Sequence, residues 1–197
     1  MSTTRTIAIV GAGFCGTLAA AHLLRAPHRQ RTRIVLIERT AAIGRGTAYA
    51  TREHGFLLNV PAARMSADSQ RPLDFLHFAQ QRLPHVTAED YLPRALYGEY
   101  LEATLRDAES TAPSHVRCER LRAEVHAVEP KPASTTLFVR LADGQTLLAD
   151  DVVLALGNPP PGEPATIPHE LCQQGKHETD PRYISDPWSQ PLSFRPH

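Results

Sequence analysis

Short continuous apolar runs stand near both ends of the first 157 residues. Residues 7–10, 34–37 and 152–156 consist of Ile, Val, Leu and Ala, and runs of this kind are typical of parallel strands buried on both faces. Between the first two runs, residues 14–25 carry small and apolar side chains at helical spacing, and Pro27 follows them. The pattern predicts a strand, a helix and a second strand at the start of a parallel sheet.

The spacing of apolar residues changes in the middle of the chain. Residues 72–83 and 94–108 have helical spacing, whereas residues 41–65 have no clean period and predict loops over the strand ends. Three later runs predict short antiparallel strands, with Ala-Asp-Gly as a hairpin turn before the last one: 121–128, 135–141 and 145–148. We expect an α/β fold, a Rossmann-like domain with a central parallel sheet and an antiparallel β-meander excursion.

Three glycines follow the first apolar run with the spacing G-x-G-x-x-G. Gly11, Gly13 and Gly16 have separate tasks in this fingerprint: a tight turn, close approach to a pyrophosphate, and close packing of the helix on the strand. The predicted helix begins near Phe14, so its unpaired N–H groups and positive dipole end face the turn and favour a diphosphate. The sequence predicts a dinucleotide site here, and the alternative is a glycine-rich turn without a ligand.

A carboxylate follows the second apolar run. Glu38 stands 22 residues after Gly16, close to the ~20 residues expected before an acidic side chain that binds a ribose. A carboxylate there accepts hydrogen bonds from ribose hydroxyls and repels a 2′-phosphate, which favours FAD or NAD over NADP. Arg39, the next residue, places a positive charge beside it.

Composition and charge exclude several classes of partner. Lys plus Arg and Asp plus Glu number 21 each, and 42% of the 197 residues are hydrophobic, so we expect a globular protein that does not attract nucleic acid. The longest early apolar stretch, residues 17–24, is too short to cross a bilayer, and we expect no membrane association. Cys15, Cys118 and Cys172 are too far apart for a dithiol centre, and this pattern favours a cytoplasmic location.

The chain changes character after Gly157. Nine of the 17 prolines lie beyond it, so we expect a dinucleotide-binding domain at 1–157 and a proline-rich arm, or the start of a missing C-terminal part, at 158–197. An open parallel sheet of this class usually has more strands than the apolar runs predict. A missing C-terminal segment or a partner chain is therefore an expected partner.

Several other site chemistries have incomplete motifs. Thr17 stands where a Walker A loop needs lysine, so we do not expect an NTPase. Gln173 occupies the place of the second histidine of H-E-x-x-H. His169, Cys172 and His177 remain a weak metal set in a proline-rich arm, and we expect no metal.

Two side chains remain candidates for chemistry near a bound cofactor. Cys15 lies at the predicted helix start, where a thiol can become reactive, but packing of a small residue is the favoured interpretation. His54 could act as an acid or base, and the alternative is a surface histidine. No catalytic residue is assigned from the sequence.

The motifs together resemble a family of flavoproteins. The glycine fingerprint, Glu38, the antiparallel excursion and the strand that ends at Gly157 resemble two-dinucleotide-domain flavoproteins, whose first fingerprint holds FAD. More narrowly, five segments resemble the bacterial FAD/NAD(P)-binding flavoprotein family that includes FAD-dependent urate hydroxylases: Arg45-Gly-Thr-Ala-Tyr49, Leu57-Leu-Asn-Val-Pro-Ala-Ala-Arg-Met-Ser66, Arg94-Ala-Leu-Tyr-Gly-Glu-Tyr-Leu101, Leu154-Ala-Leu-Gly-Asn-Pro-Pro160 and Asp186-Pro-Trp188. The resemblance covers nearly the whole chain, which would be an N-terminal FAD-binding part.

The resemblance implies cofactor contacts for particular residues. Glu38 would bind the adenosine ribose and Arg39 would lie beside the adenine. The backbone of Val125 would meet the adenine edge, and Gly157 would let its strand end approach the cofactor. The residues implied to line the pyrophosphate are those of the turn itself: Gly11, Ala12, Gly13, Phe14, Cys15 and Gly16. Three loop residues would reach the phosphates or the flavin ring, or else only stabilise their loops: Arg45, Asn59 and Arg64.

The function implied by the resemblance is that of the FAD-binding domain of an NAD(P)H-dependent flavin oxidoreductase, of monooxygenase or hydroxylase type, acting on a small molecule. FAD would be the cofactor and NAD(P)H the co-substrate. Members of the family continue beyond the Asp-Pro-Trp segment, and this sequence has one glycine fingerprint, so hydride delivery would need a second nucleotide site. The alternative is a truncated, non-catalytic FAD- or NAD-binding module that needs a partner segment.

Overall fold

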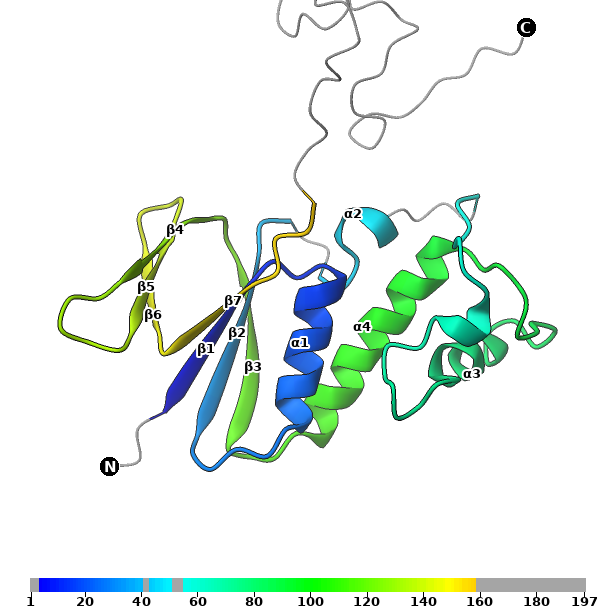
Figure 1. The fold of residues 1–197 in the computed structure, drawn as a ribbon, viewed down its shortest axis with the longest axis horizontal. Helices are drawn as coiled ribbons and strands as arrows, with labels where there is room; N and C mark the ends of the chain where they lie inside the picture. Colours follow the sequence, from blue (N-terminus) through cyan, green and yellow to red (C-terminus); the bar gives the residue numbers. More distant parts are fainter. Residues whose placement is uncertain (1–3, 41–42, 51–54, 159–197) are drawn as a thin grey trace, which may run out of the picture. The chain divides into compact units, whose positions relative to one another are not determined.

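The computed structural model describes residues 4–40, 43–50 and 55–158. Up to Gly157 these residues form one compact unit. Figure 1 shows a central sheet in that unit, with two long helices along one face and a smaller sheet beyond the other. None of the helices in the described ranges is long and apolar enough to span a membrane.

The central sheet has four parallel strands. They are β1 (Arg5–Val10), β2 (Thr32–Glu38), β3 (Val116–Arg122) and β7 (Asp151–Leu154), in the order β3-β2-β1-β7. Each neighbouring pair runs parallel. The parallel sheet predicted from the apolar runs is therefore confirmed.

Two helices cover one face of this sheet. Successive strand residues point to opposite faces, and Ile9, Ile34 and Leu36 point toward α1 (Phe14–Arg25) and α4 (Arg94–Thr111). Figure 1 shows the two helices side by side on that face. The predicted bounds of α1 are confirmed at both ends, and the helix expected at 94–108 extends one turn further.

A separate antiparallel sheet covers the opposite face. Its strands are β4 (Val125–Pro130), β5 (Leu137–Leu141) and β6 (Thr146–Ala149), in the order β4-β5-β6. Their buried side chains pack with the alternate residues of the central strands, in a cluster of six: Ala8, Val35, Ile37, Val139, Leu141 and Ala149. The predicted β-meander excursion is confirmed.

One predicted strand was wrong. Residues 121–128 were expected to form a single antiparallel strand, but the structure divides them between β3 and β4. β3 pairs in parallel with β2 along its whole length, from Val116 opposite Thr32 to Arg122 opposite Glu38. Its alternation of polar and apolar residues belongs to an edge strand of the central sheet, where one side stays exposed to water.

A helical excursion lies between β2 and β3 and leads into α4. It contains α2 (Gly46–Tyr49), the 3-10 helix η1 (Ala62–Arg64) and α3 (Asp74–Gln80). The helix expected at 72–83 is thus shorter than predicted, and the region expected to be loop contains two single-turn helices. Phe75 is fully buried, with its ring centroid 4.9 Å from that of Tyr97 and 5.3 Å from that of Tyr100.

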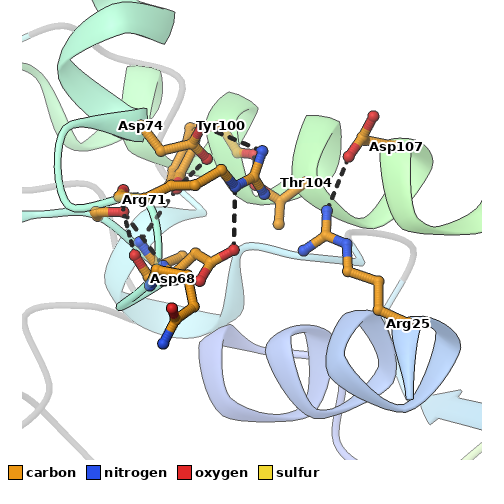
Figure 2. Close-up of polar contacts among 10 residues, drawn as sticks. Arg25, Asp68, Arg71, Asp74, Tyr100, Thr104 and Asp107 are labelled. Atoms are coloured by element: carbon orange, nitrogen blue, oxygen red, sulfur yellow. Dashed lines mark hydrogen bonds and ion pairs between the residues drawn. The ribbon is translucent and has the colours of Figure 1, made fainter. Parts of the chain in front are cut away.

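A polar network fastens the excursion to α4 (Figure 2). The Asp68 carboxylate accepts hydrogen bonds from the Gln70 N–H at 2.9 Å and from Arg71 Nε at 3.0 Å. The Tyr100 hydroxyl donates to Asp74 Oδ2 at 2.9 Å and accepts from a backbone N–H at 3.1 Å. Because Asp74 begins α3 and Tyr100 lies on α4, the bond between them holds the start of α3 on α4.

Asp68 should make stability depend on pH. Its backbone bond to Gln70 and, after the opposing effect of burial, the Arg71 guanidinium lower the pKa of this carboxyl. Because its folded-state pKa lies below the unfolded value, the ionised Asp68 carboxylate stabilises the folded state fully above about pH 4. This stabilisation is lost as pH falls through the lowered pKa. We expect Asp68→Asn to lose about 1 kcal/mol of unfolding free energy at neutral pH and less as pH falls. Urea titrations of both proteins from pH 7 to pH 3 measure this, and a difference that does not change with pH would contradict the assignment.

Candidate dinucleotide-binding site

The glycine turn lies between the end of β1 and the start of α1. Gly11 has a φ of +96°, in the left-handed region that favours glycine, and its N–H donates to the Ile37 carbonyl at 2.9 Å. A Cβ on Gly11 would overlap the carbonyl oxygen of Ala155, and a Cβ on Gly16 would overlap the carbonyl oxygen of Gly11. The first and third glycines are therefore required by close backbone packing between β1, α1 and the segment after β7.

Gly13 faces a different neighbour. Its φ of −73° is open to any residue, and a Cβ there would lie 3.3 Å from the Cα of Gly46. The second glycine thus faces the first residue of α2 rather than the sheet. A side chain at this position would press on the backbone of Gly46.

The first turn of α1 presents unpaired donors. Thr17 is the first residue whose N–H bonds into the helix, to the Gly13 carbonyl at 3.0 Å. The N–H groups before it have no acceptor within the helix, and the positive end of the helix dipole lies with them. Such a helix start is suited to an anion of the size of a phosphate.

Glu38 lies at the end of β2 and binds the turn directly. Its Oε2 accepts the Ala12 N–H at 2.9 Å, and its Oε1 accepts both the N–H and the hydroxyl of Thr40 at 3.0 Å. A carboxylate has about four lone-pair sites, so these three bonds leave one on Oε2. The side chain therefore holds the turn and retains one acceptor position for a hydroxyl.

A second loop, residues 44–46, packs against the glycine turn. The Gly44 N–H donates to the Ala12 carbonyl at 2.8 Å, and Gly44 and Gly46 have φ angles of +98° and +54°. Arg45 between them is 8% exposed, and its Nε donates to Glu102 Oε1 on α4 at 2.6 Å. Arg45, expected to reach a phosphate or the flavin ring, thus has Nε committed to a carboxylate of the protein.

Three further predicted residues lie at the start of α1 or directly after Glu38. Phe14 is 38% exposed, and its ring lies 6.3 Å from that of Tyr49 and 6.2 Å from that of Tyr97. Cys15 in the same helical turn is exposed. Arg39 is exposed directly after Glu38.

Val125 and Gly157 both lie at the carboxyl end of the central sheet, the first beside β2 and the second after β7. The Ala123 N–H donates to the Glu38 carbonyl at 3.0 Å, which places Val125, two residues later, near the end of β2. Gly157 has a φ of +71° and comes two residues after Ala155, whose N–H donates to the β1 carbonyl of Val10 at 2.8 Å. Both residues therefore share the edge on which the glycine turn lies.

Asn59 and Arg64 are not drawn into this group by the described residues. Both side chains are exposed in the helical excursion, where the backbone pairs with the segment that precedes α4. Within the described ranges, no hydrogen bond or ion pair connects either of them to the glycine turn. His54, His169, Cys172 and His177 lie outside the described residues.

Sequence reasoning missed two residues of α4 that contact the second loop. These are Glu102, bonded to Arg45, and Gly98, where a Cβ would lie 2.9 Å from the Tyr49 carbonyl oxygen. The available signal was the glycine inside a helical pattern, which often marks a close approach of another backbone. A glutamate on a helix has no comparable signal.

Two titratable side chains of the domain, Tyr97 and Cys118, stay in their neutral form. Burial, with Tyr49 and Tyr100 as smaller causes, raises the pKa of the Tyr97 hydroxyl. Burial also raises the pKa of the Cys118 thiol to about 12, so this cysteine on β3 is not a thiolate at neutral pH. In the described ranges, no group of three or more His, Cys, Asp or Glu side chains is placed to hold a metal ion.

A parallel strand, helix and strand, with a glycine turn and a carboxylate meeting at one edge of the sheet, define a Rossmann-like dinucleotide-binding domain. Residues 8–159 match the sequence profile of the family described as FAD-NAD(P)-binding, and the chain belongs to that family. The cofactor class expected from the sequence is thereby confirmed. A comparison with curated proteins gave no match.

Solved structures with the same fold include several monooxygenases. The closed structure of a cyclohexanone monooxygenase has a TM-score of 0.52 at 23% identity, over 84% of this chain and 28% of that one. An oxidized steroid monooxygenase bound to NADP has a TM-score of 0.56 at 20% identity, over 83% and 28%. A mutant flavin monooxygenase from Stenotrophomonas maltophilia has a TM-score of 0.52 at 21% identity, over 78% and 38%. This chain thus spans about a quarter to two fifths of the length of these proteins.

Substitution of Gly13 tests the space beside the turn. Gly13→Ala needs a shift of a few tenths of an ångström against Gly46. The branched side chain of Gly13→Val would need a larger shift and would crowd the turn where we expect the diphosphate. We expect the valine variant to bind FAD at least about tenfold more weakly, equivalent to ~1.4 kcal/mol. Quenching of flavin fluorescence measures the affinity, and thermal unfolding checks the fold.

Gly55→Val is the control for this series, because a Cβ at Gly55 would meet no described atom within 4 Å. Wild-type affinity in Gly13→Val, with the unfolding temperature unchanged, would contradict the placement of the diphosphate.

Proposed function

We propose that this chain is the FAD-binding part of an NAD(P)H-dependent flavin oxidoreductase of the monooxygenase type. The observation that supports it most is the junction at Ala12, where the Glu38 carboxylate binds the N–H inside the glycine turn at 2.9 Å. This junction sets the acidic side chain beside the helix start, so a diphosphate and its ribose have adjacent partners.

The residues of the turn fit the adenosine half of FAD. The free N–H groups at the start of α1, between Gly13 and Gly16, would bind the pyrophosphate. Glu38 has one acceptor position left for a ribose hydroxyl, and its charge disfavours a 2′-phosphate. Arg39 and the backbone of Val125, near the end of β2, would lie beside the adenine.

Bound FAD would supply electron transfer from a reduced nicotinamide and the activation of oxygen, chemistry that the side chains of this domain lack. The domain itself would bind and orient the cofactor. The neutral aromatic side chains of Phe14, Tyr49 and Tyr97 would exclude water beside the helix start. Asn59, Arg64 and Gly157 are proposed to line the remainder of the cofactor site, and Arg45 would lie in the loop beside the glycine turn.

The substrate is proposed to be a small molecule. The solved structures with this fold carry names of enzymes for cyclohexanone and steroids, and the segments that resemble urate hydroxylases favour a heterocycle. At identities of 20–23%, these likenesses show the fold alone, so hydroxylation of a small heterocyclic substrate stays a prediction.

A second candidate is a binding module that holds FAD or NAD and acts with another segment or chain. The sequence contains one glycine fingerprint, at Gly11–Gly16, whereas hydride transfer between two nucleotides needs two sites. In this candidate the domain boundary expected after Gly157 separates the cofactor holder from the part that completes the enzyme.

Two measurements on the purified 197-residue protein test these functions: the absorption spectrum tests cofactor binding, and consumption of reduced nicotinamide distinguishes the enzyme from the module. We expect flavin bands between roughly 350 and 500 nm after incubation with FAD and removal of free cofactor. Consumption of NADH or NADPH by the loaded protein would favour the oxidoreductase, and flavin bands without consumption would favour the module. A protein that takes up NAD but no FAD would refute the flavin assignment and leave the fold in place.

Glu38→Gln tests the ribose contact. The amide keeps the shape of the side chain, loses its charge and cannot accept at both ends, so we expect FAD affinity to fall about tenfold, equivalent to ~1.4 kcal/mol. Isothermal titration with FAD measures the change. Glu119→Gln on β3 is the control, because this carboxylate pairs with Arg33 at 2.6 Å and lies outside the turn. Equal affinities of Glu38→Gln and Glu119→Gln would count against the assigned ribose partner.

A further inference from the structure

The loop of Gly44, Arg45 and Gly46 lies directly against the glycine turn. One hydrogen bond connects them, from the Gly44 N–H to the Ala12 carbonyl at 2.8 Å. The second contact is between two glycines, since a Cβ on Gly46 would lie 3.0 Å from the Cα of Gly13. Any displacement of this loop therefore removes a contact from the residues that are proposed to bind the diphosphate.

The other side of the same loop rests on α4. Arg45 Nε donates to Glu102 Oε1 at 2.6 Å, and a Cβ on Gly44 would lie 3.1 Å from Glu102 Cγ. Gly98, one helical turn earlier on α4, admits the Arg45 side chain, whose Cγ would lie 3.1 Å from a Cβ there. Residues four apart share a helix face, so Gly98 and Glu102 form one contact surface for the Arg45 side chain. Figure 1 shows α2, which follows this loop, near the amino-terminal end of α4.

Because the ion pair between Arg45 and Glu102 is largely buried, its loss should change the position of the loop. The Arg45 side chain is 10% exposed and the Glu102 side chain 37% exposed. A guanidinium buried to this extent is unfavourable without its carboxylate, because it has lost most of its hydration. If Glu102 loses its charge, the lowest-cost response is movement of Arg45 toward water. That movement draws Gly44 and Gly46 away from the turn.

We propose that Glu102 is a positioning residue of the cofactor site: through Arg45 it holds the loop of residues 44–46 against the glycine turn. This inference rests on the proposed function, and it assigns to Arg45 a bond within the protein in place of a bond to a phosphate. The loop then contributes to cofactor binding by keeping Ala12 and Gly13 in place.

The size of the effect follows from the fraction of molecules in which the loop is docked. Apparent affinity falls in proportion to the binding-competent fraction. If the loop is docked in one molecule of ten after Glu102→Gln, the dissociation constant for FAD rises about tenfold.

The test is a double-mutant cycle with Arg45→Gln, Glu102→Gln and both together in the 197-residue protein. If Arg45 acts through Glu102, each single variant weakens FAD binding about tenfold and the double variant is no weaker than either. Hydrogen exchange of the Gly44 N–H, measured without any ligand, gives a second readout. It should become faster in Glu102→Gln, because the bond to Ala12 opens.

Asp107→Asn is the matched control. Asp107 also lies on α4 and pairs with an arginine, Arg25 of α1, at 2.8 Å (Figure 2). This pair joins two helices away from the loop, so its loss should leave FAD affinity and Gly44 exchange unchanged while it shifts the unfolding temperature slightly. A variant that only loosens α4 would behave like this control.

Two results would overturn the inference. One is wild-type FAD affinity in Glu102→Gln with unchanged exchange at Gly44. The other is additive losses in the cycle, which would mean that Arg45 contacts the cofactor independently of Glu102. If the wild-type protein itself binds neither FAD nor NAD, the proposed function fails first, whereas the exchange measurement still reports on the loop.

Discussion

The peptide groups of Ala12 are the point at which three elements of this domain meet. Its N–H is bonded to Glu38 at the end of β2, at 2.9 Å. Its carbonyl accepts the Thr17 hydroxyl from α1 at 3.1 Å and the Gly44 N–H from the second loop at 2.8 Å. The conformation of the glycine turn is therefore set by the protein before any ligand arrives. A site arranged in this way loses little conformational entropy on binding.

α4 is the second element that the site depends on. It packs with α1 on the central sheet, it carries Tyr97 and Tyr100 in the aromatic cluster of the excursion, and it presents Gly98 and Glu102 to the loop before α2. Because one rigid helix contacts the core, the excursion and the loop, their positions relative to the turn are coupled. The polar network of Figure 2 connects α4 to α3, and the Arg25–Asp107 pair connects α4 to α1.

Most of the proposed cofactor site consists of main chain. The turn offers N–H groups, Glu38 keeps one acceptor position beside its three bonds to the protein, and Arg45 is bonded to Glu102. Side chains near the site therefore act mainly by fixing backbone positions, and the neutral Tyr97 and Cys118 add no acid or base at neutral pH. This division agrees with membership of the FAD-NAD(P)-binding family, in which the cofactor carries the chemistry.

The sequence alone determined the elements whose information is local. Apolar runs and the glycine spacing predicted β1, α1, β2 and the last strand, because burial on two faces and a tight turn leave their mark within a few residues. The placement of β3 came only from the tertiary structure, since a strand of alternating Arg, Glu, Cys and Leu fits either sheet until its neighbour is known. The Arg45–Glu102 pair joins residues 57 apart, and its burial exists only once α4 has packed on the core. Local pattern predicted where a dinucleotide can bind, and long-range packing decided which side chains surround that place.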